Sequence, residues 1–164
     1  MKTPKTVIWD WNGTLADDGY ASLLVVNDIL AKRNMPPITM EQYYQYIDTP
    51  ISRFYEHLFD LNKVPMSEIT RDFQAFYPRH FQALHQGVPE LLGSLRNHDI
   101  PQIILSSGYQ AALERDLFRF HIAGYFDAVL GANDTLASGK VQRGLDWLAT
   151  QSIAPEDMVL IGDT

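Results

Sequence analysis

The sequence predicts an α/β fold in which a doubly wound parallel sheet carries an inserted block of helices. Along the C-terminal half, short apolar segments alternate with helical patterns, as in sheets with right-handed crossovers. A similar apolar segment, Val7–Trp9, lies near the N-terminus. Between these parts, residues 17–86 show helical patterns and no convincing strand.

The first predicted strand ends in a carboxylate. Residues 7–9 lead directly into Asp10, and a turn with Asn12 and Gly13 follows. A short apolar run bounded by turn residues is typical of a buried strand. Because α/β sheets place ligands at the carboxyl ends of their strands, we expect Asp10 to lie at the mouth of the sheet. Gly13 would allow backbone amides to approach an anion there.

The inserted block is expected to hold four helices. Thr39 and Gln42 resemble a capping box. Pro50 suits the first turn of the third helix, and Ser67 is expected to cap the fourth. The four helices are expected at 21–33, 39–47, 50–61 and 67–84, with a break in the last before Pro78.

After Gly87, helices and strands alternate. The expected order is a helix at 89–97, a strand at 102–105, a helix at 110–120, a strand at 126–130, a helix that follows Gly139 and Lys140 and runs to about 150, and a strand at 158–161. The expected domains are therefore an α/β core of residues 1–16 and 87–164, and a helical domain of residues 17–86.

Composition excludes several classes of function. With 13 basic against 20 acidic residues, the net charge is −7 and the pI is near 5.0, so we expect no nucleic-acid partner and no membrane partner. There is no cysteine, which rules out disulfide and thiolate chemistry. No signal peptide or membrane-spanning run is evident, so the expected location is cytoplasmic.

Four polar residues fall at predicted strand ends or loops: Asp10, Ser106, Lys140 and Asp163. The carboxyl ends of parallel strands share one edge, so these residues can meet in one crevice. Two carboxylates suit a magnesium ion, and one carboxylate can act as a nucleophile. A lysine and a hydroxyl can hold an anionic transferring group. Together these groups indicate phosphoryl transfer.

Each of these residues also fits an ordinary structural role. An aspartate after a strand is usually a turn or cap residue, and Ser106 could equally cap the following helix. A lysine near a helix start is most often solvated. Their joint occurrence in this order favours the functional reading.

Four segments resemble the motifs of the haloacid dehalogenase superfamily. Residues 10–15, Asp-Trp-Asn-Gly-Thr-Leu, resemble the first motif, Asp-x-Asp-Gly-Thr-Leu. The second, third and fourth motifs are matched by residues 103–107, 138–140 and 159–164. The resemblance spans nearly the whole core and is strongest to phosphoglycolate-phosphatase-like members. It implies a Rossmann-like core, with residues 17–86 as a cap that closes over the substrate.

The resemblance also implies roles for individual residues. Asp10 would be the nucleophile that forms an aspartyl-phosphate. Asp10, the backbone carbonyl of Asn12 and Asp163 would hold Mg²⁺. The implied catalytic set is Asp10, Asn12, Ser106 and Lys140. The residues implied in phosphate binding are Asn12, Gly13, Thr14, Ser106, Ser107 and Lys140.

Two departures from the family pattern affect the expected activity. Asn12 stands where the pattern has an acid, and an amide cannot carry out general acid–base catalysis, which is worth roughly 10²–10⁴-fold in rate. We therefore expect weak hydrolysis or a stalled aspartyl-phosphate, unless another group supplies the proton. Asn12 also precedes Gly13, a dipeptide prone to deamidation, which would generate aspartate. The second departure is that Thr164 falls inside the fourth motif, so we expect the last part of the core to be missing.

The resulting expectation is a magnesium-dependent phosphatase of a small phosphorylated metabolite. The alternatives are a phosphate-binding or regulatory protein disabled by Asn12, and a hydrolase of carbon–phosphorus or carbon–halogen bonds. The resemblance implies that the apolar strand at 158–161 lies beside the first strand and that the missing segment normally covers its other side. Here that strand would be an exposed sheet edge, so a homodimer through this edge is the expected protein partner.

Overall fold

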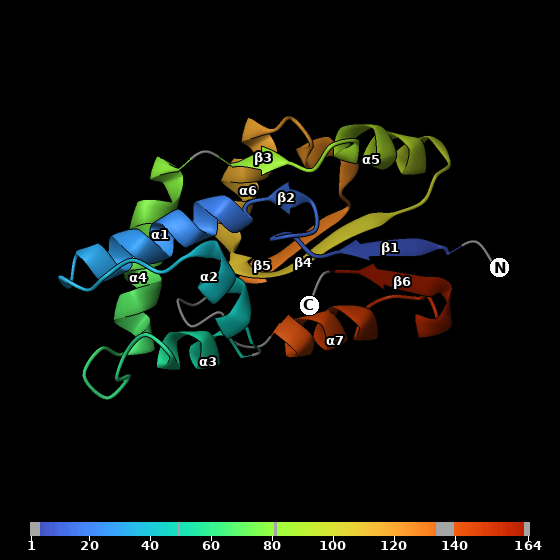
Figure 1. Ribbon diagram of the computed structural model, residues 1–164. Helices are drawn as coiled ribbons and strands as arrows, with labels where there is room; N and C mark the ends of the chain where they lie inside the picture. The colour runs from blue at the N-terminus through green and yellow to red at the C-terminus, as the bar shows by residue number, and fades with distance from the viewer. Residues whose placement is uncertain (1–3, 49, 81, 134–139, 163–164) are drawn as a thin grey trace. The chain divides into compact units, whose positions relative to one another are not determined.

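The computed structural model describes residues 4–48, 50–80, 82–133 and 140–162. The chain divides into two compact units (Figure 1). The first unit comprises Met1–Asp17 and Ala83–Thr164, and the second comprises Asp18–Gln82. Among the helices of the described residues, none has the length and apolar character needed to cross a membrane.

The first unit is built on a parallel sheet with the strand order β5-β4-β1-β6 (Figure 1). Its strands are β1 (Thr6–Trp9), β4 (Gln102–Tyr109), β5 (Ala128–Ala132) and β6 (Met158–Ile161). The predicted parallel α/β fold is therefore confirmed. Its helices are α5 (Val88–Asn97), α6 (Gln110–Arg119) and α7 (Lys140–Ala149), with 3-10 turns η2 (Ala123–Tyr125) and η3 (Pro155–Asp157).

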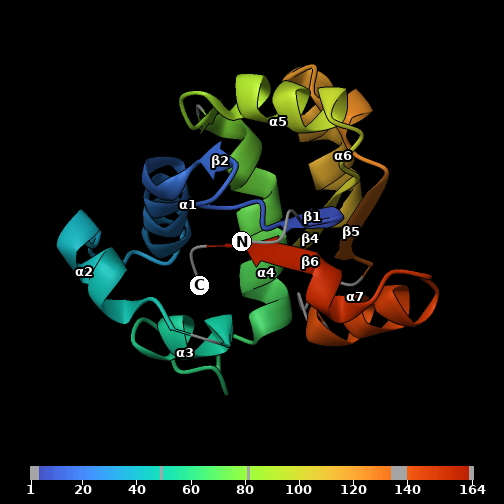
Figure 2. The ribbon, with the colours of Figure 1, turned by 90° about the vertical axis from the view of Figure 1, so that its right-hand side faces the viewer.

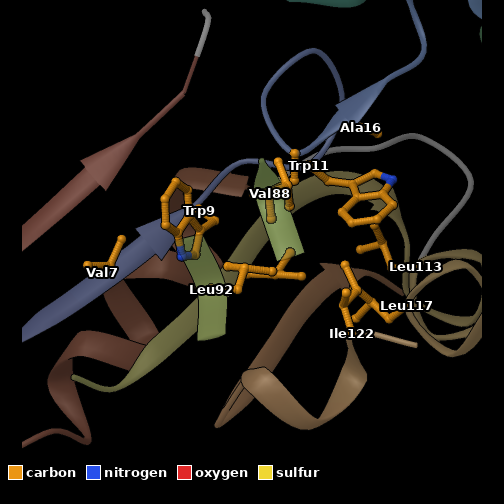
Figure 3. Close-up of a cluster of buried hydrophobic side chains, with 11 residues drawn as sticks. Val7, Trp9, Trp11, Ala16, Val88, Leu92, Leu113, Leu117 and Ile122 are labelled. Carbon is orange, nitrogen blue, oxygen red and sulfur yellow. The ribbon is translucent and has the colours of Figure 1, made fainter. Parts of the chain in front are cut away.

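Alternating side chains of the strands divide the core of this unit between the two faces of the sheet. Val7 and Trp9 of β1 pack with Leu92 of α5 and Leu117 of α6 on one face (Figure 3). Ile8 points to the other face, where its cluster includes Trp147 of α7. Figure 2 shows α5 and α6 on one side of the strands and α7 on the other. This layering leaves the carboxyl ends of β1, β4 and β6 free for chemistry.

The second unit is helical. It contains α1 (Gly19–Ala31), α2 (Met40–Tyr46), α3 (Ile51–Glu56), α4 (Met66–Phe76) and the 3-10 turn η1 (Tyr77–Arg79). The predicted capping box is present: Gln42 N–H donates to Thr39 Oγ1 at 3.2 Å, and Thr39 N–H donates to Gln42 Oε1 at 2.9 Å. The fully buried core of this unit includes Val25, Ile29, Phe54 and Ile69.

Several predicted boundaries are wrong. The third helix ends at Glu56 rather than near 61. Near the expected end, Asp60 Oδ1 accepts the Asn62 N–H, and such a local side-chain bond to the backbone competes with helical hydrogen bonds. Pro65, not Ser67, is the N-cap of α4. The structure also has two short strands, β2 (Ala16–Asp17) and β3 (Ala83–Leu84), where only helices were expected. Strands of two residues are too short to give a periodic signal.

In the second unit, one buried carboxylate connects α1 to α4. Asp72 Oδ1 accepts a hydrogen bond from Lys32 Nζ at 2.7 Å, and Asp72 Oδ2 lies 2.8 Å from an Arg33 guanidinium nitrogen. Burial on its own would raise the pKa of Asp72, but the hydrogen bonds from Lys32 and Arg33 outweigh it and hold that pKa below its usual 3.8. The ionised form of Asp72 therefore stabilises the folded state.

We predict that Asp72→Asn lowers the free energy of unfolding by about 2 kcal/mol at pH 7, as expected for hydrogen bonds to charged groups. Since the pKa is lower in the folded state, this stabilisation is complete above about pH 4 and is lost as the pH falls through the lowered pKa. Urea unfolding at pH 7 and pH 3 measures the difference.

Asp60→Asn is the matched control, because the Asp60–Lys63 pair is exposed and its atoms are 3.4 Å apart. We expect a change of at most about 0.5 kcal/mol for this variant. An equal loss for Asp72→Asn at both pH values would contradict the prediction.

Within the described sheet, β6 has β1 as its one neighbour. Its residues Val159, Leu160 and Ile161 are 37%, 62% and 38% exposed. An apolar edge strand offers unpaired backbone groups to a second chain. The edge therefore has the character that the sequence analysis expected.

We predict that the 164-residue chain self-associates through β6 and that Leu160→Lys shifts it toward monomer, because a charge on an edge strand opposes strand pairing. Light scattering after gel filtration, over a range of concentrations, measures the mass. Val141→Lys, a change of similar chemistry at a residue of α7 that is 75% exposed, is expected to leave the mass unchanged. A parent chain that stays monomeric at every concentration would rule out this association.

Candidate active site

Asp10 lies at the carboxyl end of β1, directly after Trp9. Its backbone N–H donates to the carbonyl of Ile161 at 2.8 Å, so the last residue of β6 lies beside it. The whole residue is only 6% exposed. The predicted position at the end of the first strand is thus where the structure places Asp10.

The Asp10 carboxylate is held by two donors from different parts of the chain. Oδ1 accepts the backbone N–H of Trp11 at 2.8 Å. Oδ2 accepts from Lys140 Nζ at 2.5 Å, a charge-assisted contact between residues 130 positions apart. A carboxylate has about four lone-pair sites, so the described contacts leave room for both a ligand and an attack on an electrophile.

Ser106 lies on the neighbouring strand β4 and is 1% exposed. Its Oγ accepts the backbone N–H of Gly108 at 2.9 Å. The expected strand end at 105 is wrong, because β4 continues to Tyr109 with a shift in its pairing to β5 between Leu105 and Tyr109. Such irregularities redirect side chains near active sites, and here Ser106 and the exposed Ser107 follow Leu105.

The segment after Asp10, residues 11–15, forms a tight turn that we call the first loop. Trp11 closes it, since its carbonyl accepts the N–H groups of Thr14, Leu15 and Ala16 at 3.3, 3.0 and 2.9 Å. Gly13 has φ of +72°, a conformation that side chains with a Cβ rarely adopt. Asn12 is exposed.

One hydroxyl group of the first loop is buried and unsatisfied among the described residues. Thr14 Oγ1 is buried and has no hydrogen-bond partner among the described residues. Buried hydroxyls are normally hydrogen-bonded, so an unsatisfied one calls for an explanation. A bound anion or water would supply the missing partner.

Arg143, on α7 one turn after Lys140, is a residue that the sequence analysis missed. Its guanidinium donates to the Ser106 carbonyl at 2.8 Å. The helix runs very close to β4 here, because a Cβ on Gly144 would lie 2.9 Å from Leu105 Cδ2. The three-residue spacing from Lys140 placed Arg143 on the same helical face, and this was the available signal.

His85 was also missed. Its ring Nε2 lies 3.1 Å from the Gly13 carbonyl oxygen, and its backbone N–H donates to the Leu15 carbonyl at 3.0 Å. No sequence pattern pointed to this contact, because 72 residues separate His85 from Gly13.

The structure joins some predicted residues directly and leaves others apart. Asp10 and Lys140 are in contact, and Ser106 lies on β4, which pairs with β1. Asp163 lies outside the described residues, as do Ser138 and Gly139 of the third motif. In the part of the chain that the structure describes, no group of three histidine, aspartate or glutamate residues could hold a metal ion.

The described donors nevertheless suit magnesium. Mg²⁺ usually takes one or two protein carboxylates and completes its shell with water and substrate oxygens. Asp10 offers a buried carboxylate with lone pairs available, and the end of β6, which leads toward Asp163, is hydrogen-bonded to Asp10. A three-carboxylate cage is not required.

Three solved structures have closely similar folds. A haloacid dehalogenase-like hydrolase from Streptococcus pneumoniae has a TM-score of 0.85 and 18% identity, and the match covers 100% of this chain and 78% of that one. A predicted phosphatase from Clostridium acetobutylicum has a TM-score of 0.80 and 20% identity, with 99% of this chain and 77% of that one covered. A predicted phosphoglycolate phosphatase from Haemophilus somnus has a TM-score of 0.76 and 18% identity, with 99% of this chain and 78% of that one covered. Identities this low show a shared fold.

A comparison with curated protein sequences gives no match. The model of the haloacid dehalogenase-like hydrolase family matches residues 7–164, which include β1 with Asp10, β4 with Ser106 and α7 with Lys140. The chain is therefore a member of the haloacid dehalogenase-like hydrolase family.

Proposed function

We propose that the chain is a magnesium-dependent phosphatase that acts on a small phosphorylated metabolite through an aspartyl-phosphate. The observation that carries the proposal is the contact of Lys140 Nζ with Asp10 Oδ2 at 2.5 Å. A buried carboxylate beside an ammonium group can act as a nucleophile on phosphorus. Solved relatives described as phosphatases agree with this reading.

In the proposed reaction, Asp10 attacks phosphorus, and the bond from phosphorus to the ester oxygen breaks. Lys140 balances the negative charge of Asp10 and of the phosphoryl group, and the Ser106 hydroxyl donates to a phosphoryl oxygen. The buried Thr14 Oγ1, which lacks a partner among the described residues, is a further donor for that group. Water then attacks the aspartyl-phosphate and regenerates Asp10.

Magnesium would be held by Asp10, by the backbone carbonyl of Asn12 and by Asp163. When bound, the ion would neutralise phosphoryl charge and orient the substrate for in-line attack. Arg143 would help to position the Ser106 hydroxyl, because its guanidinium donates a hydrogen bond to the backbone carbonyl of the same residue.

A second function is favoured by Asn12. Its amide cannot give or accept the proton that leaving-group departure and water attack require. A site with an intact anion-binding set but without a proton carrier would bind phosphate or hold the aspartyl-phosphate, which describes a binding or regulatory protein. A carbon–phosphorus or carbon–halogen hydrolase is a third candidate, since those reactions do not need an acid at position 12.

We predict that Asn12→Asp raises phosphate-ester hydrolysis by about 10²-fold or more, as expected when a general acid–base is supplied. Release of inorganic phosphate from a panel of sugar and carboxylic-acid phosphates measures the effect. Asn12→Asp combined with Asp10→Asn is the control that should abolish turnover.

Peptide mass spectrometry of residues 10–15 must accompany this experiment, because deamidation would convert part of the parent to aspartate. If Asn12→Asp releases no phosphate from any ester, the binding function is favoured and the phosphatase proposal fails. Equal turnover by an intact, undeamidated parent would show that position 12 is not limiting.

We predict that chelation of divalent cations abolishes hydrolysis by Asn12→Asp and that added Mg²⁺ restores it, whereas Ca²⁺ does not. The physical reason is that Mg²⁺ accepts few protein ligands in a compact octahedral shell, and Ca²⁺ needs six to eight oxygens. Initial rates against free metal concentration measure the dependence. Full activity in the presence of a chelator would instead favour metal-independent dehalogenation.

A further inference from the structure

The loop that carries Asn12 is attached to a histidine from a distant part of the sequence. The ring Nε2 of His85 lies 3.1 Å from the Gly13 carbonyl, and the His85 N–H donates to the Leu15 carbonyl at 3.0 Å. His85 directly follows β3, which pairs with β2 through Ala16 and Leu84. The imidazole is therefore held against the residue that follows Asn12.

The hydrogen bond to Gly13 fixes the chemistry of the ring. A carbonyl oxygen can only accept, so Nε2 carries the hydrogen and the neutral ring keeps a lone pair on Nδ1. That nitrogen can take up a proton and release it again. His85 is half-buried, and among the described residues no ion pair joins its ring to a carboxylate.

The charged groups on the surrounding elements are known. Asp10 follows β1, Asp17 lies in β2 and is exposed, and Lys140 opens α7. Asp10 and Lys140 are paired with each other.

Three of the other four histidines make side-chain contacts elsewhere. His57 stacks on Tyr46, and His80 bonds to Asp28 in the second unit. His98 bonds to the Ser94 carbonyl on α5. Within the part of the chain that the structure describes, it is the ring of His85 that contacts the first loop.

We propose that His85 transfers the proton that Asn12 cannot, which rests on the proposed phosphatase function. As Asp10 attacks phosphorus and the bond to the ester oxygen breaks, protonated Nδ1 gives its proton to the departing oxygen. Neutral Nδ1 then takes a proton from the water that attacks the aspartyl-phosphate. The bond from phosphorus to Asp10 breaks, and phosphate, the free carboxylate and the protonated ring are released.

Four chains test the proposal: the parent, His85→Gln, Asn12→Asp and the double variant. Glutamine keeps a donor for the Gly13 carbonyl but cannot shuttle a proton. With phenyl phosphate and Mg²⁺, we expect His85→Gln to lower kcat about 10²-fold in the parent and less than about threefold in the Asn12→Asp background. A purely structural role would lower kcat equally in both backgrounds.

Two further readouts are independent of folding. The pH profile of kcat in the parent should lose its limb between pH 5 and 8 in His85→Gln, and added imidazole should partly restore His85→Gly. Peptide mass spectrometry of residues 10–15 gives the fraction of Asn12 that has deamidated in each preparation of the parent. Turnover that rises in proportion to this fraction would assign the activity to deamidated chains and overturn the proposal.

The outcomes separate this inference from the function on which it rests. If Asn12→Asp hydrolyses phenyl phosphate while the undeamidated parent is silent, the chain is a phosphatase and the role of His85 is refuted. If no variant, including Asn12→Asp, hydrolyses any phosphate ester, both proposals fail. Equal losses from His85→Gln in both backgrounds would leave His85 as a support for the first loop and refute proton transfer.

Discussion

The ion pair between Asp10 and Lys140 is the contact on which the rest of the site depends. It joins the end of β1 to the start of α7, which lie 130 residues apart in the sequence. Parallel strands make this contact possible because their carboxyl ends share one edge of the sheet. Without the lysine, the Asp10 carboxylate, whose side chain is only 9% exposed, would lose its ion-pair partner, and a buried charge without a partner is destabilising.

Helix α7 is the element that assembles these groups. Its first turn presents Lys140 to Asp10, and Arg143 reaches the carbonyl of Ser106 on β4. Gly144 packs closely against Leu105, which brings α7 near β4 and its Lys140 and Arg143 side chains near their partners. One helix therefore contacts both Asp10 at the end of β1 and the backbone of Ser106 on β4, and a shift of this helix would disturb both contacts together.

The fold and part of the site followed from the sequence, for identifiable physical reasons. Apolar runs such as 7–9 and 158–161 have the length and composition of buried or edge strands, and both lie where they were expected. The positions of Asp10 and Lys140 at element ends followed from motif spacing. His85 did not, because its contact with Gly13 is a single side chain on a backbone carbonyl across 72 residues, with no periodicity to reveal it. The extension of β4 through Ser106 was likewise hidden, since Ser106, Ser107 and Gly108 read locally as a turn.

The pairing of β2 with β3 has a consequence for how the inserted segment between them can change in length. Asp17 pairs with Ala83, so the two places where the chain leaves and re-enters the first unit are neighbouring strand positions. Paired strands lie about 5 Å apart, a gap that a hairpin of two residues can close. The sheet therefore does not set the length of the segment 18–82, because an insertion of another length could begin and end at the same paired positions. The hydrogen bonds of His85 to the first loop lie on the sheet side of the junction and would survive the exchange.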